Sequence, residues 1–124
     1  MSASAQMDAQ TWAPSFRAHP ELAKAMKLVG IDAVITANNH ALDTGSQGLR
    51  DTLKILRQNN LHAVGTGNYL TEAREPVILE RSQIKIGVLA YTEPENSLMG
   101  YATETKAGVA PLNLKHIQAD IEKL

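Results

Sequence analysis

Two consecutive helix-to-strand units in the first half of the chain constrain the fold more than any other feature. In the first unit, Pro20 is suited to open a helix, apolar residues then recur at helical spacing, and Gly30 is expected to end the helix. A buried strand is predicted to follow over residues 31–37. The second unit repeats this order, with a helix over residues 47–59 and a short strand over residues 61–64. Such alternation is typical of α/β folds.

A β-hairpin and a last helix are predicted for the second half of the chain. After a short helical turn at residues 71–75, strands over residues 77–81 and 84–91 are joined by a two-residue link, which favours antiparallel pairing. The second of these strands is rich in apolar residues and is expected to be largely buried. Residues 92–111 show no periodicity, so a lid over a site and a flexible connector remain alternatives. Asn113 is expected to cap the last helix.

The length and polarity of the chain suggest one domain or part of one. It has 124 residues, of which 44% are hydrophobic, an ordinary proportion for a globular protein. Residues 1–15 are small and polar, and we predict a flexible N-terminal lead-in that docks, if at all, through Trp12 and Phe16. Residues 16–124 then form the folded part.

Charge and cysteine content exclude several classes of site. Twelve Lys and Arg residues against thirteen Asp and Glu residues give a net charge of -1, which offers no support for a nucleic-acid surface. The chain has no cysteine, which excludes disulfides and thiolate metal ligands. No apolar run reaches the ~18 residues that a transmembrane helix needs. The function therefore has to be argued from particular polar residues.

The candidate functional residues follow the first predicted strand directly. Asn38, Asn39 and His40 come first and Asp43 follows, and α/β proteins bind ligands beyond the carboxyl ends of strands. An asparagine oxygen suits Mg²⁺- or Mn²⁺-like ions, and a histidine transfers a proton near neutral pH when a carboxylate fixes its tautomer. We expect Asn39 and the His40 ring to face one hollow. Asp43 is expected either to contact that ring or to cap the next helix.

A structural interpretation of the same segment is a polar strand-to-helix connection.

Glu93, after residues 84–91, is the only other acid near a predicted strand end, and the sequence does not tell which way it faces. Residues 65–67, Gly-Thr-Gly, are predicted to form a tight turn, because Leu70 stands where a dinucleotide loop needs a third glycine. His62 lies inside an apolar run and is predicted to be a buried structural histidine.

Four segments of the sequence resemble the CapA-like capsule-synthesis family, whose members are linked to bacterial poly-γ-glutamate synthesis. The resemblance covers nearly everything from Phe16 onward, in the family's order. Its most specific part is Asn38-Asn39-His40-Ala41-Leu42-Asp43. The four segments are residues 16–22, residues 37–45, residues 64–67 and residues 84–92.

The resemblance implies a fold and a chemistry, because that family is similar to the calcineurin-like metallophosphoesterases. Those enzymes hold two divalent metals at the tips of a β-sandwich flanked by helices, so the expected fold is part of an α/β sandwich. By this resemblance Asn39 is a metal ligand, His40 a catalytic proton donor and Asp43 the residue that orients the imidazole. Two features depart from the phosphoesterase pattern: Asn38 replaces a glycine, and the acid follows the histidine by three residues instead of one.

The family's other metal ligands lie upstream and downstream of the segments found here, so the chain is expected to carry the central motif of a larger protein. One hypothesis is that the larger protein is a hydrolase that depends on Mn²⁺- or Mg²⁺-like ions. The present chain alone is then expected to be inactive and to bind no metal. The other is a non-catalytic scaffold or binding subunit that keeps the fold without a complete metal site. Expected partners are a polyanionic capsule polymer or a phosphate-containing small molecule, with self-association through exposed sheet edges. The resemblance implies a location at the cell envelope, outside the membrane.

Overall fold

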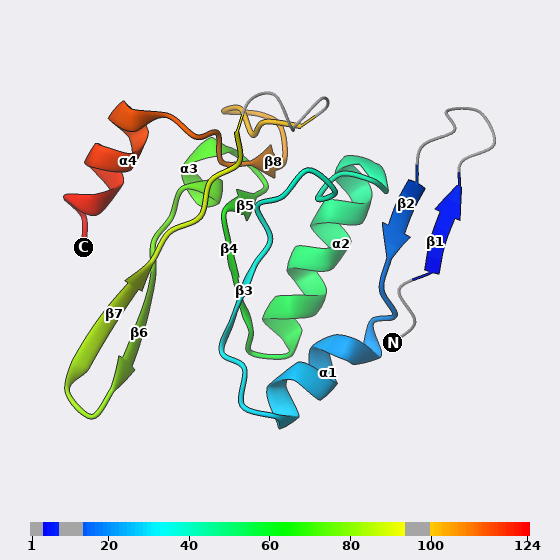
Figure 1. Cartoon of the computed structure of the whole chain (residues 1–124), viewed down its shortest axis with the longest axis horizontal. Coiled ribbons are helices and arrows are strands. Elements are labelled where there is room, and N and C mark those ends of the chain that lie inside the picture. The colour runs from blue at the N-terminus through cyan, green and yellow to red at the C-terminus, as the bar shows by residue number, and fades with distance from the viewer. Residues whose placement is uncertain (1–3, 8–13, 94–99) are drawn as a thin grey trace.

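A computed structural model describes residues 4–7, 14–93 and 100–124, which form a mixed α/β fold (Figure 1). In Figure 1 the β3–β4 pair lies between helix α2 and the β6–β7 hairpin. The predicted α/β class and the order of elements are confirmed. The elements are β1 (Ser4–Met7), β2 (Pro14–Arg17), α1 (Glu21–Leu28), β3 (Ala33–Ile35), α2 (Gly45–Gln58), β4 (His62–Val64), β5 (Thr66–Gly67), α3 (Leu70–Ala73), β6 (Val77–Arg81), β7 (Ile84–Val88), β8 (Gly108–Val109) and α4 (Leu114–Ile121).

The β3–α2–β4 segment is a βαβ unit with parallel strands. Ala33 pairs with His62 and Ile35 with Val64, as expected when a helix connects two neighbouring strands. Strand β3 is shorter than predicted and is not buried, because the side chain of Ile35 is 63% exposed. The prediction of a buried strand is therefore wrong. The described sheet has only two strands, and helices α1 and α2 do not cover the face of the sheet on which the Ile35 side chain lies.

The hydrophobic core lies on the predicted apolar face of α2. Leu49, Leu53 and Leu56 are all buried on this face, which confirms the helical periodicity. Leu56 packs with Ala23 of α1 and with Leu61, so this cluster joins both helices to the strand pair. Leu49 and Leu53 form a second cluster with Ala107, and the third cluster consists of the buried residues Ala73, Ala102 and Ala110.

The β6–β7 hairpin is antiparallel, as the two-residue link predicted. Ser82 and Gln83 have φ values of +49° and +68°, so both link residues adopt the left-handed conformation that tight hairpins require, without glycine or asparagine. The predicted burial of the second strand is wrong, since Ile84 is 64% exposed and Ile86 is 54% exposed. Figure 1 shows the reason: the tip of the hairpin extends away from the helices.

His62 and the segment after it are a second case in which local pattern and structure diverge. The prediction of a tight turn over residues 65–67 is wrong, because the backbone bends at Gly65 alone, with a φ of +88°, and Thr66–Gly67 form strand β5. The prediction of a buried His62 is wrong, because its side chain is exposed and lines a hollow of about 260 Å³ beside β4 and β6. An apolar run in a short strand fixes alternate faces but not whether both faces are covered.

Two segments without predicted structure contain short strands. β1 and β2 form an antiparallel pair within and next to the predicted lead-in. Trp12 lies outside the described residues, and flexibility of the lead-in stays a prediction. In the predicted loop, β8 pairs with β5, and Thr92 bridges to Pro111. Part of this loop, residues 94–99, also lies outside the described residues. A lid and a flexible connector therefore both remain predictions for this segment.

The C-terminal helix begins as its sequence predicted. The Asn113 side chain accepts hydrogen bonds from the backbone N–H groups of Lys115 and His116, which is an N-cap. Each described sheet has two strands, although β8 is also bridged at Val109 to Tyr101, so unpaired edges are expected on strands other than β8. Self-association through these edges stays a prediction. None of the helices in the described ranges has the length and apolar character needed to cross a membrane.

Core packing by α2 predicts a sharp contrast between two apolar truncations. Leu53→Ala should lower the free energy of unfolding by about 2–5 kcal/mol, because it leaves a cavity beside Ala107. Ile84→Ala, on the exposed hairpin tip, should change it by less than about 0.5 kcal/mol. Urea unfolding followed by circular dichroism measures both. Equal losses in the two variants would contradict the described core.

Candidate functional site

The polar segment after β3 is shaped by the side chain of Asn38. Its Oδ1 accepts the backbone N–H of His40 at 2.8 Å, and its backbone carbonyl accepts the N–H of Ala41 at 3.3 Å. Asparagine side chains commonly bend the backbone in this way. The turn ends the strand and presents Asn39 and His40 on successive positions of a bend.

His40 is held from two sides. Its Nδ1 lies 2.9 Å from Oδ2 of Asp43, and its ring meets Phe16 edge to face at a centroid distance of 4.5 Å. The same Asp43 oxygen accepts the backbone N–H of Phe16 at 2.9 Å. Thr44, and not Asp43, stands at the N-cap of α2, and its side chain makes no capping bond. Of the two contacts expected for Asp43, the structure therefore has the one to the imidazole.

An open hollow of about 360 Å³ lies at the ends of two chain segments. Its lining comes from the residues after β3 and after β7, and consists of Ala37, Asn38, Asn39, Tyr91, Thr92 and Glu93. Asn39 faces the hollow as expected. The His40 ring is not part of the lining, because Asp43 and Phe16 hold it, so the expectation of one hollow shared by Asn39 and His40 is met for Asn39 only.

Glu93 and Thr92 belong to this hollow although the sequence did not place them there. Thr92 is 7% exposed, and its Oγ1 has no hydrogen-bond partner among the described residues. Burial, and then the negative charge of Glu93, raise the pKa of the Tyr101 phenol, so Tyr101 stays protonated at neutral pH. The sequence does contain a signal for these two residues. The apolar strand changes abruptly to Tyr91-Thr92-Glu93, just as the apolar residues of β3 change to polar ones.

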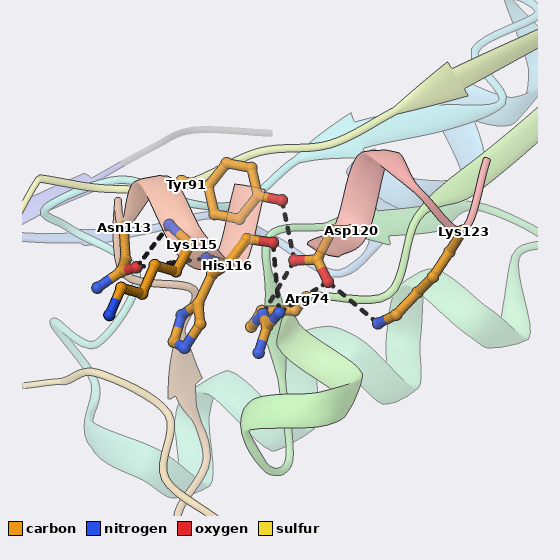
Figure 2. A network of polar contacts seen from close by, with 7 residues as sticks. All are labelled: Arg74, Tyr91, Asn113, Lys115, His116, Asp120 and Lys123. Carbon is orange, nitrogen blue, oxygen red and sulfur yellow. Dashed lines mark hydrogen bonds and ion pairs between the residues drawn. The ribbon is translucent and has the colours of Figure 1, made fainter. Parts of the chain in front are cut away.

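A buried ionic network anchors one wall of the hollow (Figure 2). Asp120 of α4 is fully buried, and Arg74 donates to its two carboxylate oxygens at 2.9 and 2.8 Å. The Tyr91 hydroxyl donates to Asp120 at 3.0 Å, and Lys123 donates at 3.0 Å. Because Tyr91 also lines the hollow, the network links the hollow to α4 and α3.

The protonation states of the network follow from its geometry. Burial by itself would raise the pKa of Asp120, but hydrogen bonds from Arg74, Lys123 and Tyr91 hold it below its usual value. Burial, and then the hydrogen bond to Asp120, raise the pKa of Tyr91 to about 12. At neutral pH Asp120 is therefore an ionised acceptor and Tyr91 a protonated donor.

The hollow offers oxygen donors for a metal, although not a complete set. Within residues 4–7, 14–93 and 100–124, no three His, Asp or Glu side chains are grouped to hold a metal ion. The Asn39 amide, the Glu93 carboxylate and the Thr92 hydroxyl, which has no hydrogen-bond partner among the described residues, are hard oxygen donors of the kind that Mg²⁺ and Mn²⁺ prefer. These residues fit one part of a coordination sphere, and they do not fit two ions by themselves.

The fold and this geometry define a mixed α/β protein with an amide- and carboxylate-lined hollow at its strand ends. The chain belongs to the family described as bacterial capsule synthesis protein PGA_cap, which it matches over residues 2–124. It is 32% identical to the PGA biosynthesis protein CapA of Bacillus subtilis (strain 168) over 93 residues, which make up 73% of this chain and 24% of that protein. It is 30% identical to the capsule biosynthesis protein CapA of Bacillus anthracis over 76 residues, or 61% of this chain and 18% of that protein. The chain thus spans about a quarter or less of the length of these relatives.

The Asp120 network predicts a specific acid dependence of stability. The contribution of Asp120 is fully present above its unfolded pKa of about 4 and is lost as the pH falls through its lower folded pKa. Asp120→Asn should lower the free energy of unfolding at neutral pH by about 3 kcal/mol and remove this part of the acid dependence. Urea unfolding in steps below about pH 5 measures both. Asp51→Asn, at an exposed position of α2, is the matched control, and an acid dependence identical in the parent and in Asp120→Asn would contradict the network.

The contact between Asp43 and His40 predicts which ring nitrogen carries the proton. In the neutral imidazole, Nδ1–H donates to Asp43 and Nε2 is free to accept. Asp43→Ala should shift the ring toward the Nε2–H tautomer, because the acceptor for the Nδ1 proton is lost. Ring ¹⁵N chemical shifts report the tautomer, and Asp51→Ala is the control. An unchanged tautomer in Asp43→Ala would show that Asp43 does not orient the ring.

Proposed function

We propose that this chain supplies the central motif of a metal-dependent, phosphoesterase-like enzyme of capsule or poly-γ-glutamate synthesis. The observation that carries the proposal is the arrangement after β3, in which Asn39 lines a hollow and Asp43 holds the His40 imidazole by a 2.9 Å contact. The family match over residues 2–124 supports the biological setting, as do the names of the relatives from the two Bacillus species. A phosphate-containing intermediate of polymer assembly is the proposed substrate class.

Each residue of the motif has a distinct role in this proposal. Asn39 would hold a divalent metal through its amide oxygen. The chemistry that such a metal supplies when bound is polarisation of a phosphoryl oxygen. Asp43 accepts a hydrogen bond from Nδ1–H of His40, so when the ring is protonated at both nitrogens, Nε2–H is the proton that it would give to a leaving oxygen. His40 stands beside the hollow and is 41% exposed, so a substrate that reaches past Asn39 can approach its free nitrogen.

The remaining ligands would come from other parts of the protein. The chain spans 24% of the Bacillus subtilis relative, and the hollow brings together one carboxylate and two amides. Two divalent ions need several anionic or imidazole ligands that converge from different strands. The proposal therefore assigns the complete reaction to a protein of the relatives' length and not to these 124 residues.

The proposal predicts activity in a full-length protein and none in this chain alone. With Mn²⁺ present, a full-length protein that contains these residues should hydrolyse an aryl phosphate, and His40→Ala should lower kcat about 10²–10⁴-fold because the proton donor is lost. The 124-residue chain should show no turnover and should not retain two tightly bound ions. His62→Ala, which changes an exposed histidine of β4, is the matched control.

Three results would decide against this proposal. Turnover by the 124-residue chain that disappears in His40→Ala would show that the site is complete without other segments. Full activity of His40→Ala in the full-length protein would remove the proton donor. A full-length protein that binds capsule polymer without hydrolysing phosphate esters would establish the scaffold function instead.

A further inference from the structure

We propose that Glu93, with Thr92 beside it, is a second arm of the cation site to which Asn39 contributes. The inference rests on the proposed function, because it adds ligands from this chain to the same metal. It goes beyond that function by naming a carboxylate from a different segment, at the end of the hairpin strand. The chemical class of ligand is a divalent cation that prefers oxygen donors.

The first argument is the position of the two arms. Asn39 follows β3, Glu93 follows β7, and both line the one hollow of about 360 Å³. The lack of a side chain at Gly65 makes this possible, because a Cβ at that position would come within 2.5 Å of the Ala37 side chain and 2.7 Å of the Ala90 carbonyl oxygen. Two strand ends are thereby brought to the same place, which is the usual way in which ligands from distant segments converge.

The second argument is the chemistry of the hollow. Among its lining residues Glu93 is the charged side chain, and the lining contains no Lys or Arg. Among residues 4–7, 14–93 and 100–124, no ion pair involves Glu93. Next to this carboxylate, Thr92 Oγ1 is buried without a hydrogen-bond partner among those residues. Buried polar atoms are normally paired, and a cation held by the exposed Glu93 carboxylate would supply a partner for the adjacent Thr92 hydroxyl.

The third argument is that this arm is held in place. The backbone N–H of Thr92 donates to the carbonyl of Ala110 at 2.9 Å, and its carbonyl accepts the N–H of Leu112 at 2.8 Å. Tyr91 is fixed through its hydroxyl to Asp120 (Figure 2). A ligand on a supported segment loses less entropy on binding than one on a free loop. Glu93 is thus presented directly after two anchored residues.

The test is titration of the ¹⁵N- and ¹³C-labelled 124-residue chain with Mn²⁺, whose unpaired electrons broaden nearby signals even at low occupancy. We expect broadening centred on both Asn39 and Glu93. Glu93→Gln removes the charge and keeps the shape, and it should raise the Kd for Mn²⁺ about tenfold or more. Glu80→Gln, at an exposed position on the hairpin, is the control and should leave the Kd unchanged. Backbone spectra that match the parent show that each variant is folded.

The outcomes separate this inference from the proposed function. An unchanged Kd in Glu93→Gln would overturn the second arm and leave Asn39 as a ligand. A raised Kd in Glu93→Gln with an unchanged Kd in Asn39→Ala would support a cation at the hairpin end and contradict the proposed role of Asn39. Absence of broadening at both residues would overturn the inference, while the hydrolysis assay on the full-length protein still tests the proposed function by itself.

Discussion

The close approach of the chain at Gly65 is the constraint on which the candidate site depends. Gly65 has a φ of +88°, and a side chain there would collide with Ala37 and with the carbonyl oxygen of Ala90. Because Gly65 has no side chain, the segment after β3 and the segment after β7 can both lie against its backbone. The polar residues that follow each alanine in the sequence then border a single hollow.

A buried charge keeps one of these segments in position. Asp120 has no exposed surface, and a buried carboxylate is costly unless its partners are also in place. Its partners come from α3, from the segment after β7 and from α4, so these parts must stay together for the charge to be satisfied. Through Tyr91 the same requirement reaches the wall of the hollow, which links local stability to the geometry of the site.

The polar residues after β3 have different structural roles. Asn38 uses its carbonyl oxygen to bend the backbone, and Asp43 uses one oxygen to hold both His40 and the backbone of Phe16. Asn39 is left to face the hollow. Membership of the capsule-synthesis family describes the setting of this motif, and the contacts distinguish Asn38 and Asp43, which shape it, from Asn39, which lines the hollow.

The sequence by itself determined the local elements of this protein. Helical periodicity located α1 and α2, the two-residue link located the hairpin, and Asn113 located the start of α4, because each of these depends on neighbours in the chain. The resemblance to the family also came from the sequence, through the motif around His40. These parts could be predicted because the interactions that form them span only a few residues.

Only the tertiary structure decided burial and the composition of the hollow. Ile35, Ile84 and His62 were expected to be buried and are exposed, because an apolar pattern does not specify whether a second layer covers the strand. The meeting of Asn39 with Glu93 likewise depends on contact between segments far apart in the chain. That contact is set by packing at Gly65 and by the Asp120 network, both of which join segments that are far apart in the sequence.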